Sequence, residues 1–336
     1  YEKRGTAVMV PEWDAAKCIQ CNNCAFVCSH ATIRPYLLSE AEEKAAPAGL
    51  VAVDTKPKAG QYKYTMSVSP LDCMGCGECV TVCPTAAIKM VPQESRLAEQ
   101  PVWDYLVKNV SKKADSGYAD STVKGSQFNQ PLLEFSGSCA GCAETSYARL
   151  ITQLFGENMY ISNATGCSSI WGGPAATCPY TINKDSKKGP AWANSLFEDN
   201  AEHGLGMYIG QKFIRDSLIA KLNEIAAGDK ASDSLKAAIA KFMETKDSTL
   251  DNVEPTKALI AELEKLDCCC KDEILEKKAY IKKKSVWIMG GDGWAYDIGF
   301  GGLDHVLASG ENVNVMVFDT EMYSNTGGQA SKASNI

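Results

Sequence analysis

The chain has 336 residues, 34 of them Lys or Arg and 41 Asp or Glu, which gives a formal net charge of −7. An acidic chain without basic runs argues against a nucleic-acid-binding protein. No apolar run reaches the ~18 residues that a membrane-spanning helix needs. At roughly 100–200 residues per domain, the length allows two domains. The 15 cysteines suit either a disulfide-rich secreted protein or a metal-binding one, and their spacing has to decide between the two.

A lead-in segment, residues 1–16, is followed by two dense groups of cysteines in residues 17–100. Each group has the spacing C-x2-C-x2-C-x3-C, and Ser29 stands in the first where Pro84 closes the second. Such runs are typical of the bacterial ferredoxins that hold two [4Fe–4S] clusters. Structural zinc also uses C-x2-C pairs, but two complete runs of four favour iron–sulfur clusters.

The ligands of these two clusters are expected to cross between the runs. Three cysteines two residues apart can wrap one cluster, and we expect the fourth to start a helix that points away and reaches the other cluster. The predicted ligand sets are Cys18, Cys21, Cys24 and Cys83 for one cluster, and Cys73, Cys76, Cys79 and Cys28 for the other.

Residues 101–130 show little periodicity and are interpreted as a linker. Beyond them, helices are predicted over 143–155, over 205–227 with apolar positions that include Ile209, Phe213, Leu218 and Leu222, and over 299–308; strands are predicted over 159–162, 285–289 and 313–318. This alternation predicts an α/β domain over 131–336 with a doubly wound, mostly parallel sheet, preceded by the small α+β ferredoxin-like domain. The charged stretch 229–284 predicts a solvated helical insertion over the surface. Because no closing helix precedes residue 336, we interpret the end of the chain as a truncation within this domain.

A third group of cysteines lies at predicted strand–helix junctions. Cys139 and Cys142 form another C-x2-C pair just before the 143–155 helix, and Cys167 follows the 159–162 strand. They could hold a third cluster, although zinc or a redox-active pair is an alternative. A fourth ligand is needed, and the candidates within the chain are Cys178 and the run Cys268, Cys269 and Cys270. We expect Cys178 to be a small packed residue and the run to be thiols without a ligand role.

A glycine-rich turn, Gly290-Gly291-Asp292-Gly293, ends the 285–289 strand. Glycines there let the backbone approach a diphosphate, and the following helix N-terminus favours an anion. Asp292 can supply a hard carboxylate to Mg²⁺, and a second polar turn, 319–329, follows the adjacent strand. An ordinary capped turn is the alternative. The pattern departs from G-x-G-x-x-G, which disfavours NAD or FAD.

These segments together carry a family resemblance. GDGWAYDIGFGGLDH and DTEMYSNTGGQASK resemble the thiamine diphosphate domain of pyruvate:ferredoxin oxidoreductases. SCAGCAETSY and GCSSIWG resemble the cluster-binding segments of that family. VPEWDAAKCIQCNNCAFVC resembles the start of its ferredoxin domain. The similarity runs in order over nearly the whole chain and is weakest over 229–284.

The resemblance implies roles for particular residues. The implied Mg²⁺ ligands are Asp292, the Thr320 hydroxyl and the Met322 carbonyl. The implied contacts with thiamine diphosphate are Gly291, Asp292, Gly293 and Trp294 at its diphosphate, together with Glu144, Cys167 and, near the reactive end as a catalytic residue, Asn325. Cys139, Cys142 and Cys167 are implied to hold a third [4Fe–4S] cluster. Its fourth ligand, the pyruvate-binding domains and the activating glutamate are implied to lie outside residues 1–336, so this chain alone should not be a competent enzyme.

The implied activity is the conversion of pyruvate and CoA to acetyl-CoA and CO2 by a cytoplasmic homodimer of anaerobic metabolism. Electrons would pass singly through three clusters to ferredoxin or flavodoxin. The alternatives are an enzyme for another 2-oxoacid such as 2-oxoglutarate or indolepyruvate, a non-catalytic iron–sulfur electron-transfer subunit, and a zinc-stabilised module. The negative charge opposes the docking of an acidic ferredoxin; a basic patch including Lys17, Arg34 or Lys63 would compensate, unless these are ordinary solvated charges.

Overall fold

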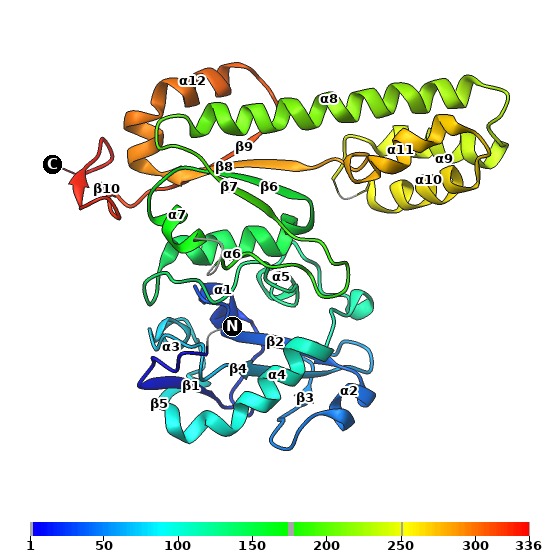
Figure 1. Cartoon of the computed structure of the whole chain (residues 1–336). Coiled ribbons are helices and arrows are strands. Elements are labelled where there is room, and N and C mark those ends of the chain that lie inside the picture. The colour runs from blue at the N-terminus through cyan, green and yellow to red at the C-terminus, as the bar shows by residue number, and fades with distance from the viewer. Residues whose placement is uncertain (1–2, 174–177, 250, 336) are drawn as a thin grey trace. The chain divides into compact units, whose positions relative to one another are not determined.

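The computed structural model describes residues 3–173, 178–249 and 251–335. The chain divides into two compact units, each described here by itself (Figure 1). The first unit comprises Tyr1–Glu157 and Cys167–Pro190, and the second comprises Asn158–Gly166 and Ala191–Ile336. No helix in the described parts of the chain combines the length and the apolar character that crossing a membrane requires.

Small antiparallel sheets form the part of the first unit that carries the two cysteine runs. Strand β1 (Met9–Trp13) pairs with β5 (Ile88–Pro92), and β4 (Lys63–Val68) pairs with both β2 (Ile33–Leu38) and β3 (Val53–Asp54). The helices of this unit are short except for α4 and α6: α1 (Asn23–Val27), α2 (Glu40–Ala45), α3 (Glu78–Thr81), α4 (Gln100–Asn109), α5 (Val123–Ser126), α6 (Ala143–Phe155) and α7 (Cys167–Gly172). The strands pack apolar side chains, among them Ile33, Tyr64 and Ile88, against the cysteines. The α+β architecture expected for the ferredoxin-like part is therefore confirmed.

Two segments outside the cysteine runs are also built into the first unit. The lead-in residues supply β1, which pairs with β5 along its whole length. The stretch 101–130, expected to be a linker, contains most of α4 as well as α5. Helix α4 has Pro101 in its first turn and buries Val102 and Leu106 against Leu38 of β2. A proline fits the first turn because the N–H that it lacks has no partner there anyway.

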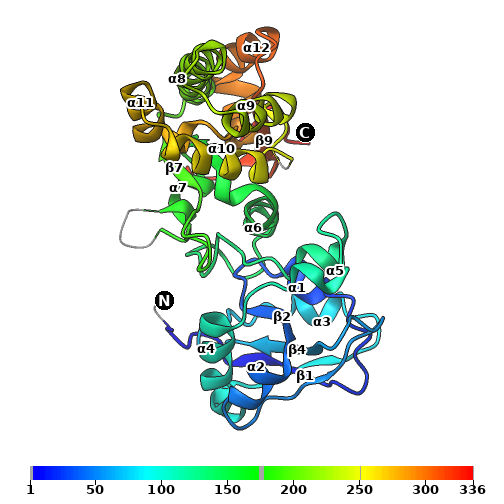
Figure 2. The same cartoon turned by 90° about the vertical axis from the view of Figure 1, so that its right-hand side faces the viewer.

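A four-stranded parallel sheet forms the centre of the second unit. Its order is β7 (Ala191–Asn194), β6 (Met159–Asn163), β8 (Ser285–Gly291) and β9 (Asn314–Phe318). Helices α8 (Asn200–Ala227) and α12 (Phe300–Ala308) lie on the same side of this sheet (Figures 1 and 2). Gly204 of α8 allows the close approach, because a Cβ at this position would lie 2.4 Å from Cγ1 of Ile288. The parallel sheet is confirmed, and the doubly wound arrangement stays a prediction.

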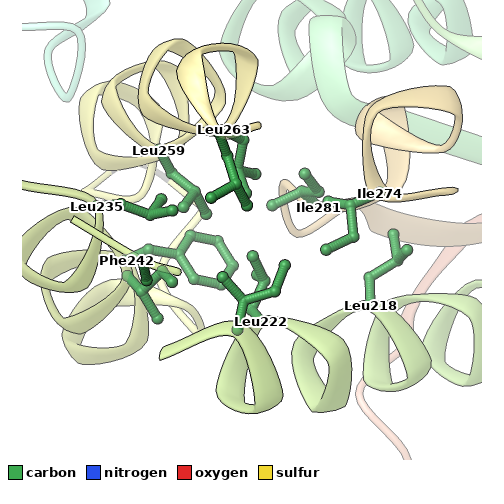
Figure 3. Packing of buried hydrophobic residues seen from close by; sticks show 12 residues of the cluster. Leu218, Leu222, Leu235, Phe242, Leu259, Leu263, Ile274 and Ile281 are labelled. Carbon is green, nitrogen blue, oxygen red and sulfur yellow. The ribbon is translucent and has the colours of Figure 1, made fainter. Parts of the chain in front are cut away.

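The charged stretch after α8 forms a helical module with a core of its own. Helices α9 (Asp233–Thr245), α10 (Val253–Lys265) and α11 (Asp272–Glu276) pack with the second half of α8 around fully buried apolar side chains such as Leu222, Phe242 and Leu263 (Figure 3). Ile209 and Phe213, in the first half of α8, are instead 50% and 76% exposed. The predicted helical character of 229–284 is correct, but the stretch is a packed module rather than only a solvated layer.

Candidate functional site

The two four-cysteine runs line two small cavities in the first unit. Cys28, Cys73, Cys76 and Cys79 line one cavity. Cys18, Cys21, Cys24 and Cys83 line the other. Each cavity thus receives three cysteines from one run and the fourth cysteine of the other run, which is the grouping that crossed ligation requires.

One expectation about these runs is wrong, because the fourth cysteine follows a helix rather than starting one. The third cysteines, Cys24 and Cys79, lie inside the short helices α1 and α3, and Cys28 is the C-terminal cap of α1. Four residues of helix advance the chain by about 6 Å. This single turn is therefore what carries the chain from one cavity to the other.

Backbone N–H groups point at the sulfurs in the same way in both runs. The first cysteine of each run accepts from the N–H two residues later, and the fourth accepts from the N–H four residues later. The donor nitrogens lie 3.2–3.4 Å from sulfur: Gln20 to Cys18, Gly75 to Cys73, Thr32 to Cys28 and Ala87 to Cys83. Hydrogen bonds to sulfur stabilise negative charge there and are one of the means by which proteins set cluster potentials.

The loops achieve this geometry through left-handed backbone conformations. In the second run these positions are Gly75 and Gly77, with φ of +69° and +84°. In the first run they are Gln20 and Asn22, with φ of +60° and +65°. Asn22 is fixed by hydrogen bonds, since its Oδ1 accepts from the Tyr64 hydroxyl at 2.8 Å and its Nδ2 donates to a backbone carbonyl at 2.9 Å. The left-handed conformation is thus stabilised by anchored side chains in the first loop and is permitted by glycine in the second.

The chemistry of these cavities fits a multinuclear anionic group. Burial raises the pKa of the Cys73 thiol to about 12 and also raises the pKa of Cys24 and of Cys79. Thiols with raised pKa values are neutral at pH 7, so a cluster bound by these cysteines would displace their protons. Among the described residues, no three His, Cys, Asp or Glu side chains converge as a single metal ion would require.

The third cysteine group lies at the starts of helices α6 and α7, also in the first unit. Cys142 caps α6 and donates its N–H to the Cys139 carbonyl at 3.1 Å, and Cys167 is the first residue of α7. The two helices are joined by a hydrogen bond of 2.7 Å from the Trp171 indole to buried Glu144. Gly141, with φ +73°, lies in the tight turn, and a Cβ there would be 3.5 Å from the Cβ of Cys76. The turn between Cys139 and Cys142 therefore lies beside one of the two cluster cavities.

A buried histidine that sequence reasoning missed connects the same loops. His30 Nδ1 lies 2.8 Å from the Ser29 hydroxyl, and its Nε2 lies 3.2 Å from the Ser138 carbonyl. Of its two partners, Ser29 directly follows Cys28 and Ser138 directly precedes Cys139, so His30 links the two cysteine loops. Burial lowers the pKa of His30, so the ring is neutral at pH 7.

A carboxylate site lies in the second unit, where β8 and β9 end. Asp292 is fully buried, and its carboxylate accepts from the Thr320 N–H at 3.2 Å and from the Ser331 hydroxyl. The Thr320 hydroxyl lies 3.2 Å from Asp292 Oδ1 and 3.1 Å from the Met322 carbonyl. These three predicted Mg²⁺ ligands are therefore neighbours. In the part of the chain that the structure describes, no Lys or Arg forms an ion pair with Asp292, so a bound cation would supply the missing positive charge. The role of Ser331 was not anticipated.

The glycine-rich turn and the polar turn expected at the cofactor both follow strands of the parallel sheet. Gly291 ends β8, and a Cβ on Gly293 would be 2.6 Å from the Tyr323 ring, so glycine is required for this packing. The Trp294 side chain is fully buried in an apolar cluster, so any contact of Trp294 with a diphosphate falls to its backbone. Asn325 is exposed in the turn between β10 (Met322–Tyr323) and β11 (Gln329–Ala330).

The structure also places the other residues that the sequence analysis singled out, and it corrects the expectations for Cys178 and Arg34. Cys178 is exposed rather than packed. Cys269 and Cys270 are exposed in the helical module of the second unit. Arg34 is buried and paired with Glu134, so it cannot belong to a basic docking patch. Lys17 and Lys63 are exposed but pair with Asp14 at 3.3 Å and Asp54 at 2.7 Å.

Comparison with known proteins agrees with this geometry. Residues 17–87 match the 4Fe-4S dicluster domain. The chain is 51% identical over its full length to pyruvate-flavodoxin oxidoreductase of Klebsiella pneumoniae, and 51% identical over 99% of its length to pyruvate:ferredoxin oxidoreductase of Moorella thermoacetica. It spans 29% of the length of each. It is also 48% identical, over 99% of its length, to pyruvate dehydrogenase [NADP(+)] of Cryptosporidium parvum, of which it spans 19%. The chain is therefore a relative of the pyruvate:ferredoxin and pyruvate-flavodoxin oxidoreductases and corresponds to one portion of those proteins.

Proposed function

We propose that the protein carrying this chain oxidises pyruvate with CoA to acetyl-CoA and CO2 and passes the electrons to ferredoxin or flavodoxin. The observation that carries the proposal is the position of three cysteine groups in one unit. Two groups line cavities with crossed cysteines, and the turn of the third lies against Cys76. A row of redox sites explains why an oxidoreductase of this kind would contain the first unit.

The number of electrons explains why several clusters would be used. Each pyruvate that is oxidatively decarboxylated releases two electrons, whereas a [4Fe–4S] cluster carries one at a time. Cys139, Cys142 and Cys167 would supply three ligands of the first acceptor. The contact of Gly141 with Cys76 supports the Cys28, Cys73, Cys76 and Cys79 cluster as the second acceptor. The cluster of Cys18, Cys21, Cys24 and Cys83 would then be the third, on the way to the external acceptor.

The second unit would hold Mg²⁺ and thiamine diphosphate. When bound, thiamine diphosphate supplies the electron sink that decarboxylation of a 2-oxoacid needs. Asp292, the Thr320 hydroxyl and the Met322 carbonyl would hold the cation, and Ser331 orients the carboxylate by its hydrogen bond. Gly291 and Gly293 would let the backbone lie close to the diphosphate. Asn325 is proposed as a further cofactor contact.

Two observations weigh against the alternatives. The relatives named above are all named for pyruvate, which favours pyruvate over other 2-oxoacids. A non-catalytic electron carrier would have no use for a fully buried carboxylate that no Lys or Arg of the described chain neutralises.

The test is the chemical analysis and activity of the full-length protein purified without oxygen. We expect about twelve iron atoms and twelve sulfides per polypeptide, four for each of three clusters, together with thiamine diphosphate and Mg²⁺. Addition of pyruvate and CoA should reduce ferredoxin or flavodoxin. Iron without thiamine would identify an electron carrier, zinc in place of iron would identify a structural module, and a preference for 2-oxoglutarate or indolepyruvate would identify a different enzyme.

A further inference from the structure

Arg149, in the middle of α6, is among the largest fully buried side chains of the protein. Its guanidinium donates to the backbone carbonyls of Cys28, at 2.9 Å, and Phe26. It also donates to the side-chain oxygens of Gln127 at 2.9 Å and Gln153 at 2.6 Å. All four acceptors are neutral oxygens. They satisfy the hydrogen bonds of the guanidinium but do not neutralise its positive charge.

The other buried arginine of this unit shows the difference. Arg34 forms an ion pair with the carboxylate of Glu134. No Asp or Glu in the described ranges forms an ion pair with Arg149. The guanidinium of arginine stays protonated at neutral pH in proteins, so Arg149 carries its positive charge into the interior. An unpaired charge in the interior is strongly destabilising unless an anion compensates it.

The missing anion can be identified from what Arg149 touches. Cys28, whose carbonyl it holds, lines the cavity together with Cys73, Cys76 and Cys79. A [4Fe–4S] cluster with four thiolate ligands is an anion, and it gains one further negative charge when it is reduced. A fixed positive charge beside it stabilises the reduced form more than the oxidised form and therefore raises its reduction potential.

We infer that Arg149 is the counter-charge of the cluster held by Cys28, Cys73, Cys76 and Cys79 and makes that cluster easier to reduce than it would otherwise be. The inference rests on the proposed function, since it requires a cluster in this cavity. Helix α6 begins directly after Cys142. The helix that starts at the proposed first acceptor thus carries a charge that favours movement of one electron onto the second.

The experiment measures reduction potentials by EPR-monitored titration of the full-length protein, with iron and sulfide analysis of every variant. Arg149→Met removes the charge at similar length, and Arg149→Lys keeps it. Gln127→Glu leaves Arg149 in place and neutralises it with a carboxylate at an oxygen that already accepts from it. Lys44→Met is the matched control, because it removes one positive charge from an exposed side chain of the same unit.

We expect Arg149→Met and Gln127→Glu to lower the equilibrium constant for reduction of this one cluster at least tenfold, which is about 59 mV for a one-electron couple. Arg149→Lys and Lys44→Met should stay near the parent value. Unchanged potentials in either Arg149→Met or Gln127→Glu with full iron content would overturn the inference. If Arg149→Met and Gln127→Glu both lose this cluster while Arg149→Lys keeps it, the inference is supported. If Arg149→Lys loses the cluster as well, the inference is overturned, because the shape of the side chain rather than its charge would then matter. A parent protein without iron would instead overturn the proposed function.

Discussion

Gly141 lies directly against Cys76, since a Cβ at Gly141 would be only 3.5 Å from the Cβ of Cys76. The turn between Cys139 and Cys142 therefore packs on a loop that lines one of the two cluster cavities. The φ of Gly141 is +73°, a conformation that side-chain-bearing residues adopt at a cost.

The first prediction follows from that conformation. Gly141→Ala should destabilise the turn by about 1–2 kcal/mol, and hydrogen exchange of the amides in the first turn of α6 should report the loss. Gly137→Ala is the matched control, because Gly137 does not have positive φ and a Cβ there would meet no atom within 4 Å. Equal exchange rates in the two variants would show that the turn does not depend on the glycine.

How much the sequence could predict differs between local pattern and long-range contact. The helix over 143–155 and the ends of β8 and β9 were predictable, because periodicity and turn residues are local properties. The grouping of eight cysteines was predictable because a repeated motif restricts which thiols can share one cluster. The expectation that the fourth cysteine starts a helix was wrong, because the structure places it after one. Four residues of helix are too few to show helical periodicity in the sequence.

Contacts between distant segments could not be predicted. Arg149 reaches Cys28 across 121 positions, and Ser331 reaches Asp292 across 39. A lone Arg in an amphipathic helix gives no sign that it is buried. Arg34 similarly looks like a surface charge in the sequence, whereas its ion pair with Glu134 is buried.

The second prediction tests the crossed ligation. Cys28→Ala should destroy the cluster held by Cys73, Cys76 and Cys79, because Cys28 lines their cavity. EPR of the reduced variant should lose the signal of this cluster, and iron content should fall by about four atoms, the content of one cluster. Cys83→Ala is the complementary variant and should remove the other cluster. Loss of the Cys18 cluster in Cys28→Ala would contradict the assignment.

The third prediction concerns the buried carboxylate. Asp292→Asn removes the only charged ligand of the proposed Mg²⁺ site, so the affinity for Mg-thiamine diphosphate should fall at least about tenfold, or 1.4 kcal/mol. Equilibrium binding to the thiamine-depleted full-length protein measures this. Asp304→Asn, an exposed carboxylate on α12, is the control and should bind as the parent does. Parent-like affinity in Asp292→Asn would exclude the proposed role.

The fourth prediction concerns the cysteines of the helical module. Replacing Cys268, Cys269 and Cys270 together with Ser should leave iron and sulfide content unchanged, because they lie in a helical module with a core of its own. Labelling of the native parent with a maleimide should report the exposed thiols of Cys269 and Cys270, and the variant should lose this labelling. A loss of about four iron atoms, one cluster, would instead make one of them the fourth ligand of the third cluster.

The last prediction concerns Cys142, which caps α6 beside the turn that touches Cys76. Cys142→Ala in the full-length protein should remove the third cluster and leave the two clusters of residues 17–87 in place. Release of CO2 from pyruvate should persist, since it depends on thiamine diphosphate rather than on a cluster. Reduction of ferredoxin should collapse, because the first electron acceptor is gone and the next site is the cluster beside Cys76. Cys178→Ala, which removes an exposed cysteine from the same unit, is the control and should keep both activities. Ferredoxin reduction at the parent rate in Cys142→Ala would show that electrons reach the Cys76 cluster by another route.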